Sequence, residues 1–322
     1  MTPPVRVGVM GCAEIARRRM LPAMAAADDI EVVAVASRDG RKAAELARTY
    51  GCRPVTGYDR LLAHPEVEAV YIPLPLAMHA QWVEAALSAG RHVLVEKPMS
   101  VDPQEVRRLF ALAAARGLAL MENVMFVHHR LHETVRRLLE DGEIGELRAM
   151  HAEFSIPRLP DHDIRYQPEL GGGALWDVGL YPVRAAMHFL GGDLRVVGSV
   201  LTVGRGRGVD TAGAVLLSRK DGVTAQVAFG IEHAYASRYR LVGSAGQIGV
   251  ERAFTPPADH APVIGVETAS GRRELLLAPD DQVANTLRAF TAGVRAGSVP
   301  EALTDSCVRQ ADLLDQVRNG AS

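Results

Sequence analysis

The chain is expected to fold as an α/β N-terminal Rossmann domain with a doubly wound parallel sheet, followed by an α+β domain with an open, mostly antiparallel sheet. Three observations predict this architecture. Short apolar runs alternate with helical segments before residue 125, a glycine-containing turn follows the first run, and the later half changes to strand-like alternation. At 322 residues the chain is long enough for two domains, which we place at 1–124 and 125–322.

Five apolar runs in the first half are too short for helices and have the composition of buried parallel strands, at 5–10, 31–37, 69–72, 92–95 and 118–122. Helical segments near 13–27, 40–50, 79–89 and 103–116 separate them. The last helix has clear end signals, because Asp102 can cap it, Pro103 occupies its first position, Glu105 completes a capping box and Gly117 follows its end. This alternation predicts helices on both faces of a parallel sheet.

The pattern changes after a helix expected near 129–142. Segments 147–156, 213–218, 223–231 and 237–243 are rich in β-branched residues and alternate or run apolar, and Lys220-Asp221-Gly222 predicts a hairpin between two of them. Helices are expected near 174–190 and at the C-terminus. Enough apolar residues alternate onto the outer face of this sheet for a partner subunit to cover it.

Composition excludes several functional classes. Hydrophobic content of 48%, charged content of 23% and a net charge of −2 are ordinary for a globular protein and predict neither nucleic acid nor an anionic membrane as partner. No apolar run approaches the ~20 residues that cross a bilayer, and the first residues lead directly into a strand. The three cysteines are scattered, which predicts neither disulfides nor a zinc site, so a cytoplasmic location is expected.

A dinucleotide-binding turn follows the first strand. In Gly11-x-Ala13-x-x-Ala16, a relaxed fingerprint, Gly11 makes the tight turn, Ala13 lets the backbone approach a pyrophosphate, and Ala16 permits close helix packing. The bare pattern is weak, but its strand-turn-helix context favours cofactor binding. We expect Cys12 and Ile15 to lie beside the cofactor as well.

The residues after the second strand predict which cofactor binds. A carboxylate there would bind the adenosine ribose of NAD, whereas an arginine would accommodate the 2′-phosphate of NADP. The chain has Ser37-Arg38, a hydroxyl and a guanidinium that suit a phosphate, so NADP(H) is favoured. Asp39 binding the ribose instead would restore NAD, and that alternative stays open.

Lys97 is the first catalytic candidate. It is one of only three lysines, with Lys42 and Lys220, among 36 lysines and arginines. A lysine near a reacting group can shift its pKa, which an arginine cannot. Lys97 follows a strand at the sheet edge where a nicotinamide lies, and Pro98 requires an extended conformation before it, with the cis or trans state left open. Glu96 is expected to hold the nicotinamide ribose.

The segment 171–182, GGGALWDVGLYP, contains the second candidate. Asp177 and Tyr181 are four residues apart and would share one helix face, and Pro182 should kink the helix just beyond Tyr181. Alone, the segment is best explained as a glycine-rich turn leading into a core helix. Reduction of a carbonyl, however, needs a proton donor for the developing alkoxide, and a cation such as Lys97 would lower the pKa of a tyrosine from its usual ~10.

Several histidines and tyrosines each allow a functional and a structural interpretation. His128-His129-x-x-His132 has metal-like spacing without a carboxylate signature, so no metal is expected and these histidines are assigned to the substrate cleft or domain junction. His79 would touch the cofactor near its pyrophosphate or lie on the surface at a helix start. Tyr235 and Tyr239 would receive a base or sugar ring, or pack within a strand.

Three segments resemble the signatures of the glucose–fructose oxidoreductase/inositol dehydrogenase family (Gfo/Idh/MocA). They are 8–13, 96–98 and 177–181, and the resemblance covers essentially the whole chain. Inositol dehydrogenases of this family have a histidine where this chain has Tyr181, which argues for the tyrosine-bearing members.

Segments 125–129, 232–235 and 251–257 resemble the nucleotide-linked sugar 3-ketoreductases of deoxysugar biosynthesis. This resemblance implies NADPH-dependent reduction of the C3 ketone of a dTDP-linked 3-keto-6-deoxysugar, a step toward glycosylated natural products such as antibiotics. The arginine-rich composition fits an actinomycete pathway. Family members commonly form dimers or tetramers through the open sheet, so the resemblance implies a homo-oligomer, either a dimer or a homotetramer.

The resemblance also implies roles for individual residues. Lys97 and Tyr181 are the catalytic pair, with Tyr181 as proton donor, and Asp177 is a carboxylate that positions the substrate. The residues expected to contact the substrate are Lys97, His128, Asp177, Tyr181, Tyr235 and Tyr239. Those expected to contact NADP(H) are Gly11, Cys12, Ala13, Ile15, Ser37, Arg38, Leu74, His79, Glu96, Lys97, Asn123 and Arg165.

Two other functions stay open at the level of sequence. One is a dehydrogenase of free aldoses or dihydrodiols, which has the same tyrosine arrangement and needs no dTDP. The other is a non-catalytic NADP-binding sensor, which would not need Lys97 and Tyr181 together.

Overall fold

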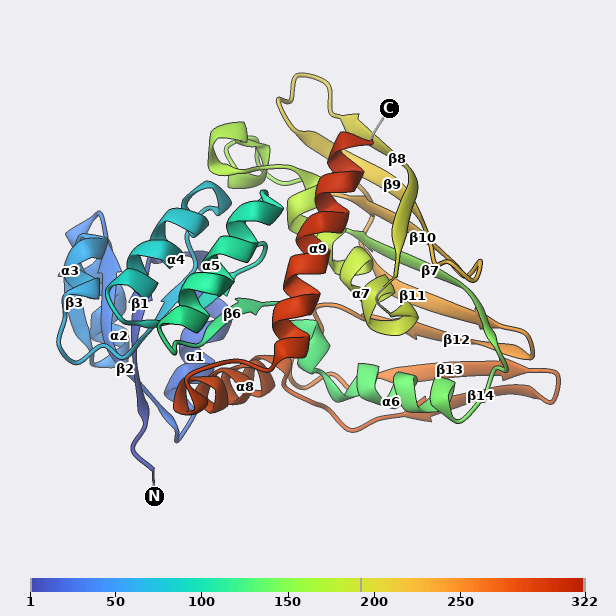
Figure 1. The fold of residues 1–322 in the computed structure, drawn as a ribbon, viewed down its shortest axis with the longest axis horizontal. Coiled ribbons are helices and arrows are strands. Elements are labelled where there is room, and N and C mark those ends of the chain that lie inside the picture. The colour runs from blue at the N-terminus through green and yellow to red at the C-terminus, as the bar shows by residue number, and fades with distance from the viewer. Residues whose placement is uncertain (1, 192, 321–322) are drawn as a thin grey trace. The chain divides into compact units, whose positions relative to one another are not determined.

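The computed structural model describes residues 2–191 and 193–320, which form two compact units (Figure 1). The first unit comprises the chain up to Val124 together with Val283–Val308, and the second comprises Met125–Gln282 and the residues from Arg309 onward. The sequence-based division placed all of 125–322 in one domain, whereas residues 283–308 return to the first unit. Thr291 shows why, since its hydroxyl donates to Asp29 across 2.6 Å.

The first unit contains a six-stranded parallel sheet in the order β3-β2-β1-β4-β5-β6. This is the predicted doubly wound sheet, and its order reverses between β1 and β4. The sequence pattern missed β3, because this strand lies at the sheet edge and is largely exposed rather than apolar. The strands are β1 (Val5–Met10), β2 (Ile30–Ser37), β3 (Arg53–Thr56), β4 (Ala69–Ile72), β5 (His92–Glu96) and β6 (Leu120–Asn123).

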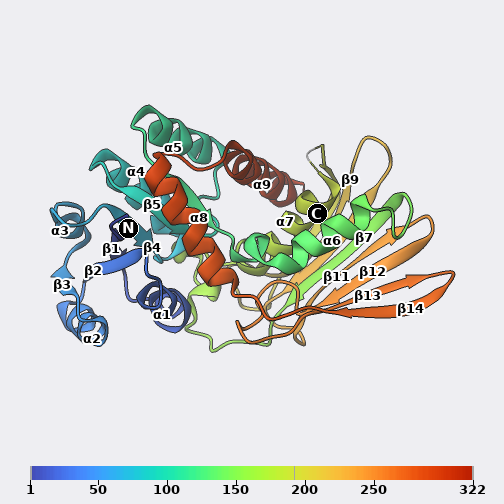
Figure 2. The same ribbon diagram turned by 90° about the horizontal axis from the view of Figure 1, so that it is seen from below.

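Helices cover both faces of this sheet, with α1 and α2 on one side and α4 and α5 on the other (Figure 2). The first of them is preceded by a π-helical turn, η1 (Ala16–Met20), and α4 is preceded by a 3₁₀ turn, η2 (Leu76–Met78). The helices of this unit are α1 (Leu21–Ala25), α2 (Gly40–Tyr50), α3 (Tyr58–Leu62), α4 (His79–Ser88), α5 (Pro103–Ala115) and most of α8 (Gln282–Ala296).

The start of α5 was predicted correctly except for one partner. Asp102 accepts from the backbone N–H of Gln104 at 2.8 Å, and Pro103 is the first helical residue. Glu105 does not complete the expected box with Asp102, since it accepts from the Ser100 hydroxyl at 2.6 Å while that hydroxyl oxygen accepts from the Asp102 N–H. Ser100 therefore links the two acidic residues, a variant of the capping box that the sequence did not indicate.

The second unit is built on an eight-stranded sheet in the order β14-β13-β12-β11-β7-β10-β9-β8. All neighbours pair antiparallel except β7 and β10, which are parallel, so the sheet is mostly antiparallel as predicted. The hairpin expected at Lys220-Asp221-Gly222 joins β9 to β10. The strands are β7 (Leu147–Ser155), β8 (Arg195–Val203), β9 (Asp210–Ser218), β10 (Thr224–Gly230), β11 (Ala236–Gly243), β12 (Gly246–Glu251), β13 (Val263–Thr268) and β14 (Gly271–Leu276).

Helices pack on one face of this sheet, among them α6 (Arg130–Glu140) and α7 (Leu180–Leu190), while the described residues place no helix on the other face (Figure 2). Short helical turns η3 (Met125–His128), η4 (Ile164–Tyr166), η5 (Pro168–Leu170) and η6 (Leu175–Gly179) lie in the connections. The last helix, α9 (Glu301–Asn319), begins in the first unit and ends in the second.

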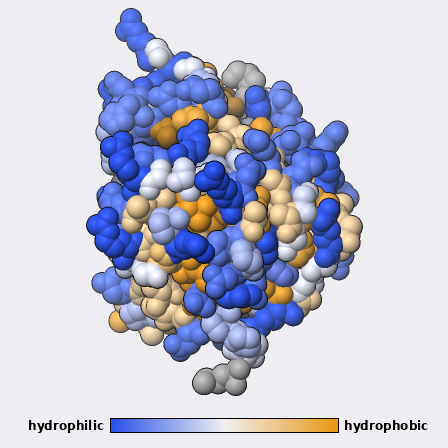
Figure 3. Space-filling model, turned by 90° about the vertical axis from the view of Figure 1, so that its left-hand side faces the viewer, coloured by the Kyte–Doolittle hydropathy of each residue, from blue (hydrophilic) through white to orange (hydrophobic). Residues whose placement is uncertain are grey.

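The core of each unit is apolar, and its surface is mixed. In β9, Val215 and Leu217 are buried while the alternate Leu216 is 37% exposed, which is the period of two expected for a strand with one covered face. Figure 3 shows the side that carries α2 and α3, where apolar patches alternate with hydrophilic residues. Among the residues that the structure describes, none of the helices combines the length and apolar character needed to cross a membrane.

Candidate active site

The predicted cofactor turn lies at the carboxyl ends of three strands. Gly11 has φ +119°, in a region that favours glycine, and its N–H donates to the Ala36 carbonyl at the end of β2. A Cβ atom at Gly11 would lie 3.0 Å from Leu74, which follows β4. The turn thus brings its backbone close to its neighbours without a side chain in the way, the arrangement that a pyrophosphate requires.

The residues that follow Gly11 hold the turn in place. The Cys12 thiol lies 3.7 Å from the Lys42 carbonyl, and Arg17 donates from Nε to the Cys12 carbonyl at 3.3 Å. Burial raises the pKa of the Cys12 thiol, and the nearby Arg17 charge opposes that rise. Ala13 and Ile15 are partly exposed at the start of the helical segment. These contacts hold the turn against the Lys42 backbone and Arg17 and leave Ala13 partly exposed.

The end of β2 presents Arg38 rather than Asp39. The Asp39 carboxylate caps α2 by accepting from the Arg41 N–H at 2.9 Å, and its own N–H donates to the Ser37 hydroxyl at 3.1 Å. Arg38 is exposed. Burial raises the pKa of the Tyr58 phenol and the charge of Arg38 opposes that rise, so these two side chains interact.

Glu96 and Asn123 form a buried network at the ends of β5 and β6. One Glu96 oxygen accepts from the Tyr71 hydroxyl and from the Asn123 amide, both at 2.6 Å. Burial raises the pKa of the Glu96 carboxyl, and these two hydrogen bonds oppose it. The sequence assigned Glu96 to the nicotinamide ribose, which stays a prediction; in the structure the residue is 8% exposed and its carboxylate accepts the two hydrogen bonds above.

Lys97 follows directly and is partly exposed, and the Lys97–Pro98 peptide bond is cis. His79 lies near it and is 2% exposed, so it is not a surface histidine, and its contact with the cofactor stays a prediction. Its two ring nitrogens face the Pro98 and Leu74 carbonyls at 2.8 and 2.7 Å.

In the second unit, the segment carrying Asp177 and Tyr181 begins as a π-helical turn. Asp177 belongs to η6 and Tyr181 to α7, so the irregularity lies before Tyr181 and not beyond it as expected. Pro182 offers a physical reason, because it has no N–H to bond the carbonyl of the preceding turn.

Asp210 caps this segment from the start of β9. Its carboxylate accepts from the Leu175 N–H at 2.7 Å, and burial raises the pKa of its carboxyl while this bond opposes the rise. Gly173 has φ +126°, and a Cβ atom there would lie 2.5 Å from an Asp210 oxygen. The glycine-rich run therefore admits the cap, a role for Asp210 that the sequence did not reveal.

Arg165 and Asp177 form an ion pair within the second unit. Arg165 donates from Nε to the Asp177 carboxylate and from Nη1 to Asp163 at 3.1 Å. Burial alone would lower the pKa of the guanidinium, but the charges of Asp177 and Asp163 hold it above its usual value. Arg165 was expected to contact the cofactor, which stays a prediction, and in the structure its side chain pairs with two carboxylates of its own unit.

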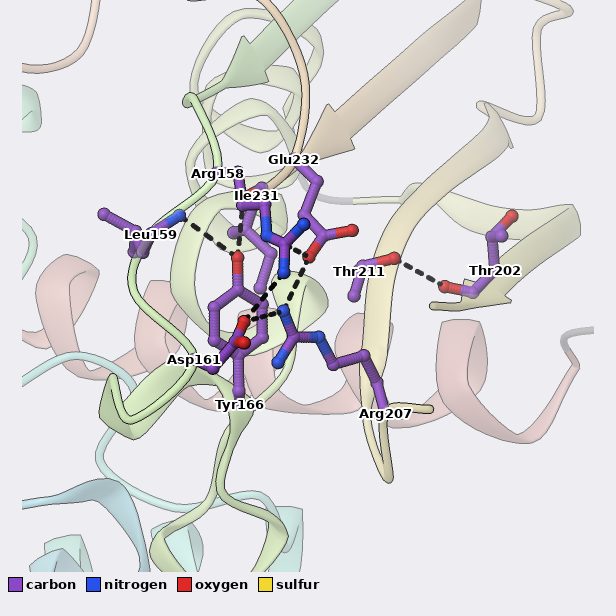
Figure 4. A network of polar contacts seen from close by, with 9 residues as sticks. All are labelled: Arg158, Leu159, Asp161, Tyr166, Thr202, Arg207, Thr211, Ile231 and Glu232. Carbon is purple, nitrogen blue, oxygen red and sulfur yellow. Dashed lines mark hydrogen bonds and ion pairs between the residues drawn. The ribbon is translucent and has the colours of Figure 1, made fainter. Parts of the chain in front are cut away.

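A second polar network holds the loop that carries Arg165 (Figure 4). Tyr166 accepts from the Leu159 N–H at 3.2 Å and donates to the Ile231 carbonyl at 3.3 Å. The Arg207 guanidinium lies 3.8 Å from the centre of the Tyr166 ring and donates to Asp161 and Glu232 at 2.7 and 3.1 Å. These contacts join the loop after β7, which carries Arg165, to the β8–β9 and β10–β11 connections.

Tyr181 lies in an aromatic cluster that fixes its ring. The ring centroids of Phe154, Phe126 and Phe254 are 5.0, 5.9 and 5.9 Å from that of Tyr181, which is 7% exposed. Such edge and tilted contacts favour one ring orientation. Lys97 belongs to the first unit and Tyr181 to the second.

The remaining expected substrate residues differ in their surroundings. Tyr235 is 51% exposed, whereas Tyr239 is 2% exposed and its hydroxyl lies 3.0 Å from His132 Nδ1. Burial raises the pKa of Tyr239, which belongs to the packed core rather than to an open surface. Burial and the Arg184 charge lower the pKa of His128 to about 4, so its imidazole is neutral.

His132, the third member of the metal-like run, also has a structural environment. It is completely buried, and its Nε2 lies 3.0 Å from the Ala253 carbonyl. Burial holds its pKa well below the usual value. Over residues 2–191 and 193–320 no three histidine, cysteine or acidic side chains are grouped as a metal site would need.

Known proteins of one family match this chain over nearly its full length. The model of the oxidoreductase family with an NAD-binding Rossmann fold (GFO/IDH/MocA) matches residues 5–124, and that of the GFO/IDH/MocA C-terminal domain matches residues 132–249. A dTDP-3,4-didehydro-2,6-dideoxy-α-D-glucose 3-reductase from Actinomadura kijaniata is 49% identical over 99% of this chain and 96% of its own length. One of the same description from Streptomyces antibioticus is 50% identical over 98% and 97%. The crystal structure of a 3-ketoreductase from Actinomadura kijaniata with NADP and TDP-benzene superposes with a TM-score of 0.97, at 49% identity over 99% of this chain and 98% of that one.

Proposed function

We propose a specific reaction for this chain, which belongs to the GFO/IDH/MocA oxidoreductase family. The reaction is the NADPH-dependent reduction of the C3 ketone of a dTDP-linked 3-keto-6-deoxysugar. The observation that carries this proposal is the identity of about one half, over nearly the full length, to reductases described for such a substrate. Candidate acid, cation and cofactor turn are all present in the chain.

The cofactor assignment is supported by the ends of β1 and β2. Gly11 provides a turn in which the backbone is free to approach a pyrophosphate, so the residues fit a dinucleotide. Arg38 is exposed where the 2′-phosphate of NADP would lie, while Asp39 is occupied in capping α2. That capping weakens the alternative in which Asp39 binds an unphosphorylated ribose.

The proton and the charge in this reaction are handled by Tyr181 and Lys97. NADPH supplies the hydride to C3 of the sugar. The Tyr181 hydroxyl gives its proton to the developing alkoxide, and its ring is held by Phe126, Phe154 and Phe254, which limits its motion. The Lys97 ammonium stabilises the alkoxide and the phenolate that remains.

Asp177 positions the substrate, and Arg165 positions Asp177. A carboxylate can accept hydrogen bonds from sugar hydroxyls, and the ion pair with Arg165 orients it. The neutral imidazole of His128 and the exposed ring of Tyr235 are the further groups assigned to the sugar nucleotide. Tyr239 stays a predicted substrate contact, but its hydroxyl is buried against His132, which favours the alternative that it packs within its strand.

The experiment is to mix the purified protein with NADPH and a dTDP-3-keto-6-deoxysugar and to follow NADPH oxidation. Turnover supports the proposal, and the Tyr181→Phe variant should lose about 10²-fold or more in kcat while binding NADPH normally. No turnover with this substrate, together with oxidation of free aldoses or dihydrodiols, would assign the chain to the alternative dehydrogenase. Protection from thermal unfolding by dTDP separates the two in a second way, since only the sugar-nucleotide enzyme should bind it.

We further propose that a second copy of this chain covers the open face of the second sheet. That face has a hollow of about 1290 Å³, and it exposes Val200, Val263 and Leu276 to the extent of 51, 39 and 72%. The hollow is away from Tyr181, which packs on the opposite face of the sheet. Sedimentation of the wild type and of a Val200→Glu variant tests this, and a monomeric wild type would contradict it.

We also propose that the protein is located in the cytoplasm. Among the described residues, Cys12, Cys52 and Cys307 form no disulfide, which suits a reducing compartment such as the cytoplasm. Fractionation of cells that express the protein would test the assignment.

A further inference from the structure

His79 makes two short contacts that its neutral form cannot satisfy together. Its Nδ1 lies 2.8 Å from the Pro98 carbonyl oxygen, and its Nε2 lies 2.7 Å from the Leu74 carbonyl oxygen. A carbonyl oxygen only accepts, so each contact is a hydrogen bond only if the ring nitrogen carries a proton. A neutral imidazole has one N–H, and only the imidazolium has two.

The surroundings of the ring contain groups that act in both directions. Burial is the largest influence and lowers the pKa of His79 below its usual value, with the Lys97 ammonium acting in the same direction, whereas the two carbonyls and the Glu122 carboxylate oppose the shift. The side chain is 2% exposed, so a nitrogen left without its partner would have no water to replace it. The hydrogen-bond geometry therefore favours a doubly protonated ring, against the effect of burial.

The two carbonyls belong to the segments that the proposed reaction needs to keep in place. Pro98 is bonded directly to Lys97, and Leu74 is the residue against which the Gly11 turn packs, at 3.0 Å from a Cβ position there. His79 itself begins α4, so its ring reaches from this helix to the ends of both β4 and β5. One side chain thus links the segment of the candidate lysine to the wall of the cofactor turn.

A second contact holds the same segment from the side of β6. The Met99 N–H donates to a Glu122 oxygen at 2.7 Å, and Glu122 is 9% exposed. Two buried side chains therefore restrain this backbone segment: His79 through the Pro98 carbonyl and Glu122 through the Met99 N–H. Without His79, the Pro98 carbonyl would lose this hydrogen bond, while the contact from Glu122 to Met99 would remain.

We propose that His79 is a positioning residue which, by donating from both ring nitrogens, fixes the Lys97–Pro98 segment relative to the Leu74 wall of the cofactor turn. The inference rests on the proposed function in that the placement of Lys97 matters for turnover. Its structural part, the doubly donating ring, does not depend on which substrate the enzyme reduces.

The first test is a measurement on the folded enzyme without substrate. With ¹⁵N-labelled histidine, the His79 ring resonances are assigned by their loss in the His79→Gln variant. Two protonated ring nitrogens near neutral pH support the proposal. A ring with one protonated and one bare nitrogen overturns it, whether or not the enzyme is a sugar reductase.

The second test separates positioning from general stability. His79→Phe keeps a ring and removes both donors, so we expect kcat to fall by about tenfold or more with the KM for NADPH within about twofold. His79→Gln retains an amide donor for one carbonyl and should have an intermediate kcat. If His79→Phe does not fold, the His79→Gln variant and the resonance measurement still decide the proposal.

Arg91 provides the matched control, because it directly precedes β5 whereas Lys97 directly follows it. Its guanidinium donates to the carbonyls of Leu62 and His64 at 3.1 and 3.2 Å and to that of Val67, so it also ties backbone segments together. Arg91→Gln should lower the melting temperature and leave kcat within about twofold. Equal losses of kcat in the His79 and Arg91 variants would show that His79 acts only through stability and would contradict the proposal. If the wild type itself does not reduce the sugar nucleotide, the proposed function fails, and the ring resonances alone judge His79.

Discussion

Arg165 donates from its Nε atom to the carboxylate of Asp177, twelve residues further along the chain, and the same guanidinium donates from Nη1 to Asp163. The pair joins the loop after β7 to the π-helical turn that leads to Tyr181. Asp177 is therefore an oriented carboxylate within the second unit, and Arg165 is the residue that orients it.

Replacing Arg165 should affect the sugar substrate more than the cofactor. In Arg165→Met the Asp177 carboxylate loses the ion pair with Arg165, so we expect kcat/KM for the sugar nucleotide to fall by about 10–100-fold, with the NADPH dissociation constant within about twofold. Steady-state kinetics and fluorescence titration of NADPH measure the two quantities. The Arg158→Met variant is the control, since Arg158 lies in the neighbouring network with its side chain 64% exposed. Weaker NADPH binding with an unchanged sugar KM would instead make Arg165 a cofactor ligand, as the sequence alone suggested.

Loss of the Asp210 cap should lower both stability and turnover. Asp210→Ala removes the acceptor of the Leu175 N–H at the start of the segment carrying Asp177 and Tyr181, and we expect a loss of about 1–2 kcal/mol in the free energy of unfolding. Asp102→Ala is a matched variant, because Asp102 caps α5 through the Gln104 N–H in the same way. Denaturant unfolding should show similar losses for both, whereas kcat should fall only in Asp210→Ala. An unchanged kcat in that variant would mean that the cap has no influence on the geometry of Tyr181.

Arg38 should decide between NADPH and NADH. Arg38→Ala removes the guanidinium proposed to pair with the 2′-phosphate, so we expect the NADPH dissociation constant to rise by about 10–100-fold and that for NADH to change little. Arg41→Ala is the control, as its side chain is 96% exposed next to the same turn. The result that argues against the assignment is an unaltered NADPH affinity in Arg38→Ala.

His128 should make the stability of the protein depend on pH. The fold lowers the pKa of its imidazole from 6.5 to about 4, through burial first and the Arg184 charge second. A lowered pKa means that the folded state favours the neutral ring, so its contribution is fully present above pH 6.5 and is lost as the pH falls toward 4. In His128→Gln the free energy of unfolding should therefore decrease less over that interval, by about 1–3 kcal/mol. Denaturant melts at several pH values measure this, with exposed His162→Gln as the control for a histidine substitution, and parallel curves for wild type and His128→Gln would refute it.

Local signals in the sequence were sufficient for much of the fold. The Gly11 turn, the Pro103 start of α5 and the hairpin at Lys220-Asp221-Gly222 are each set by residues within a few positions of one another, and all are present. Strands β3, β8, β12, β13 and β14 were missed. Several of these are rich in glycine or charged residues and lie at or near a sheet edge, so their pairing comes from neighbours rather than from an apolar pattern.

The candidate site divides in the same way. The residue types needed for reduction, with Lys97 after a strand and Tyr181 four residues after Asp177, are visible in the chain because catalysis restricts which side chains can serve. The residues that hold Tyr181 and its segment in place cannot be recognised from the sequence. Asp210 lies 35 residues from the N–H that it caps, and the rings around Tyr181 come from η3, β7 and the loop after β12.

By itself, the sequence determined a parallel-sheet unit with a dinucleotide turn, a second unit with a mostly antiparallel sheet, and the identity of the candidate acid and cation. Only the tertiary structure decided that Arg165 serves Asp177, that Tyr239 is buried against His132, and that His79 bridges two carbonyls. The physical reason is the distance along the chain between the residues that determine each feature. Turns, caps and strand patterns depend on nearby residues, whereas the partner of a buried polar group is whichever distant group the packed chain brings within hydrogen-bond distance.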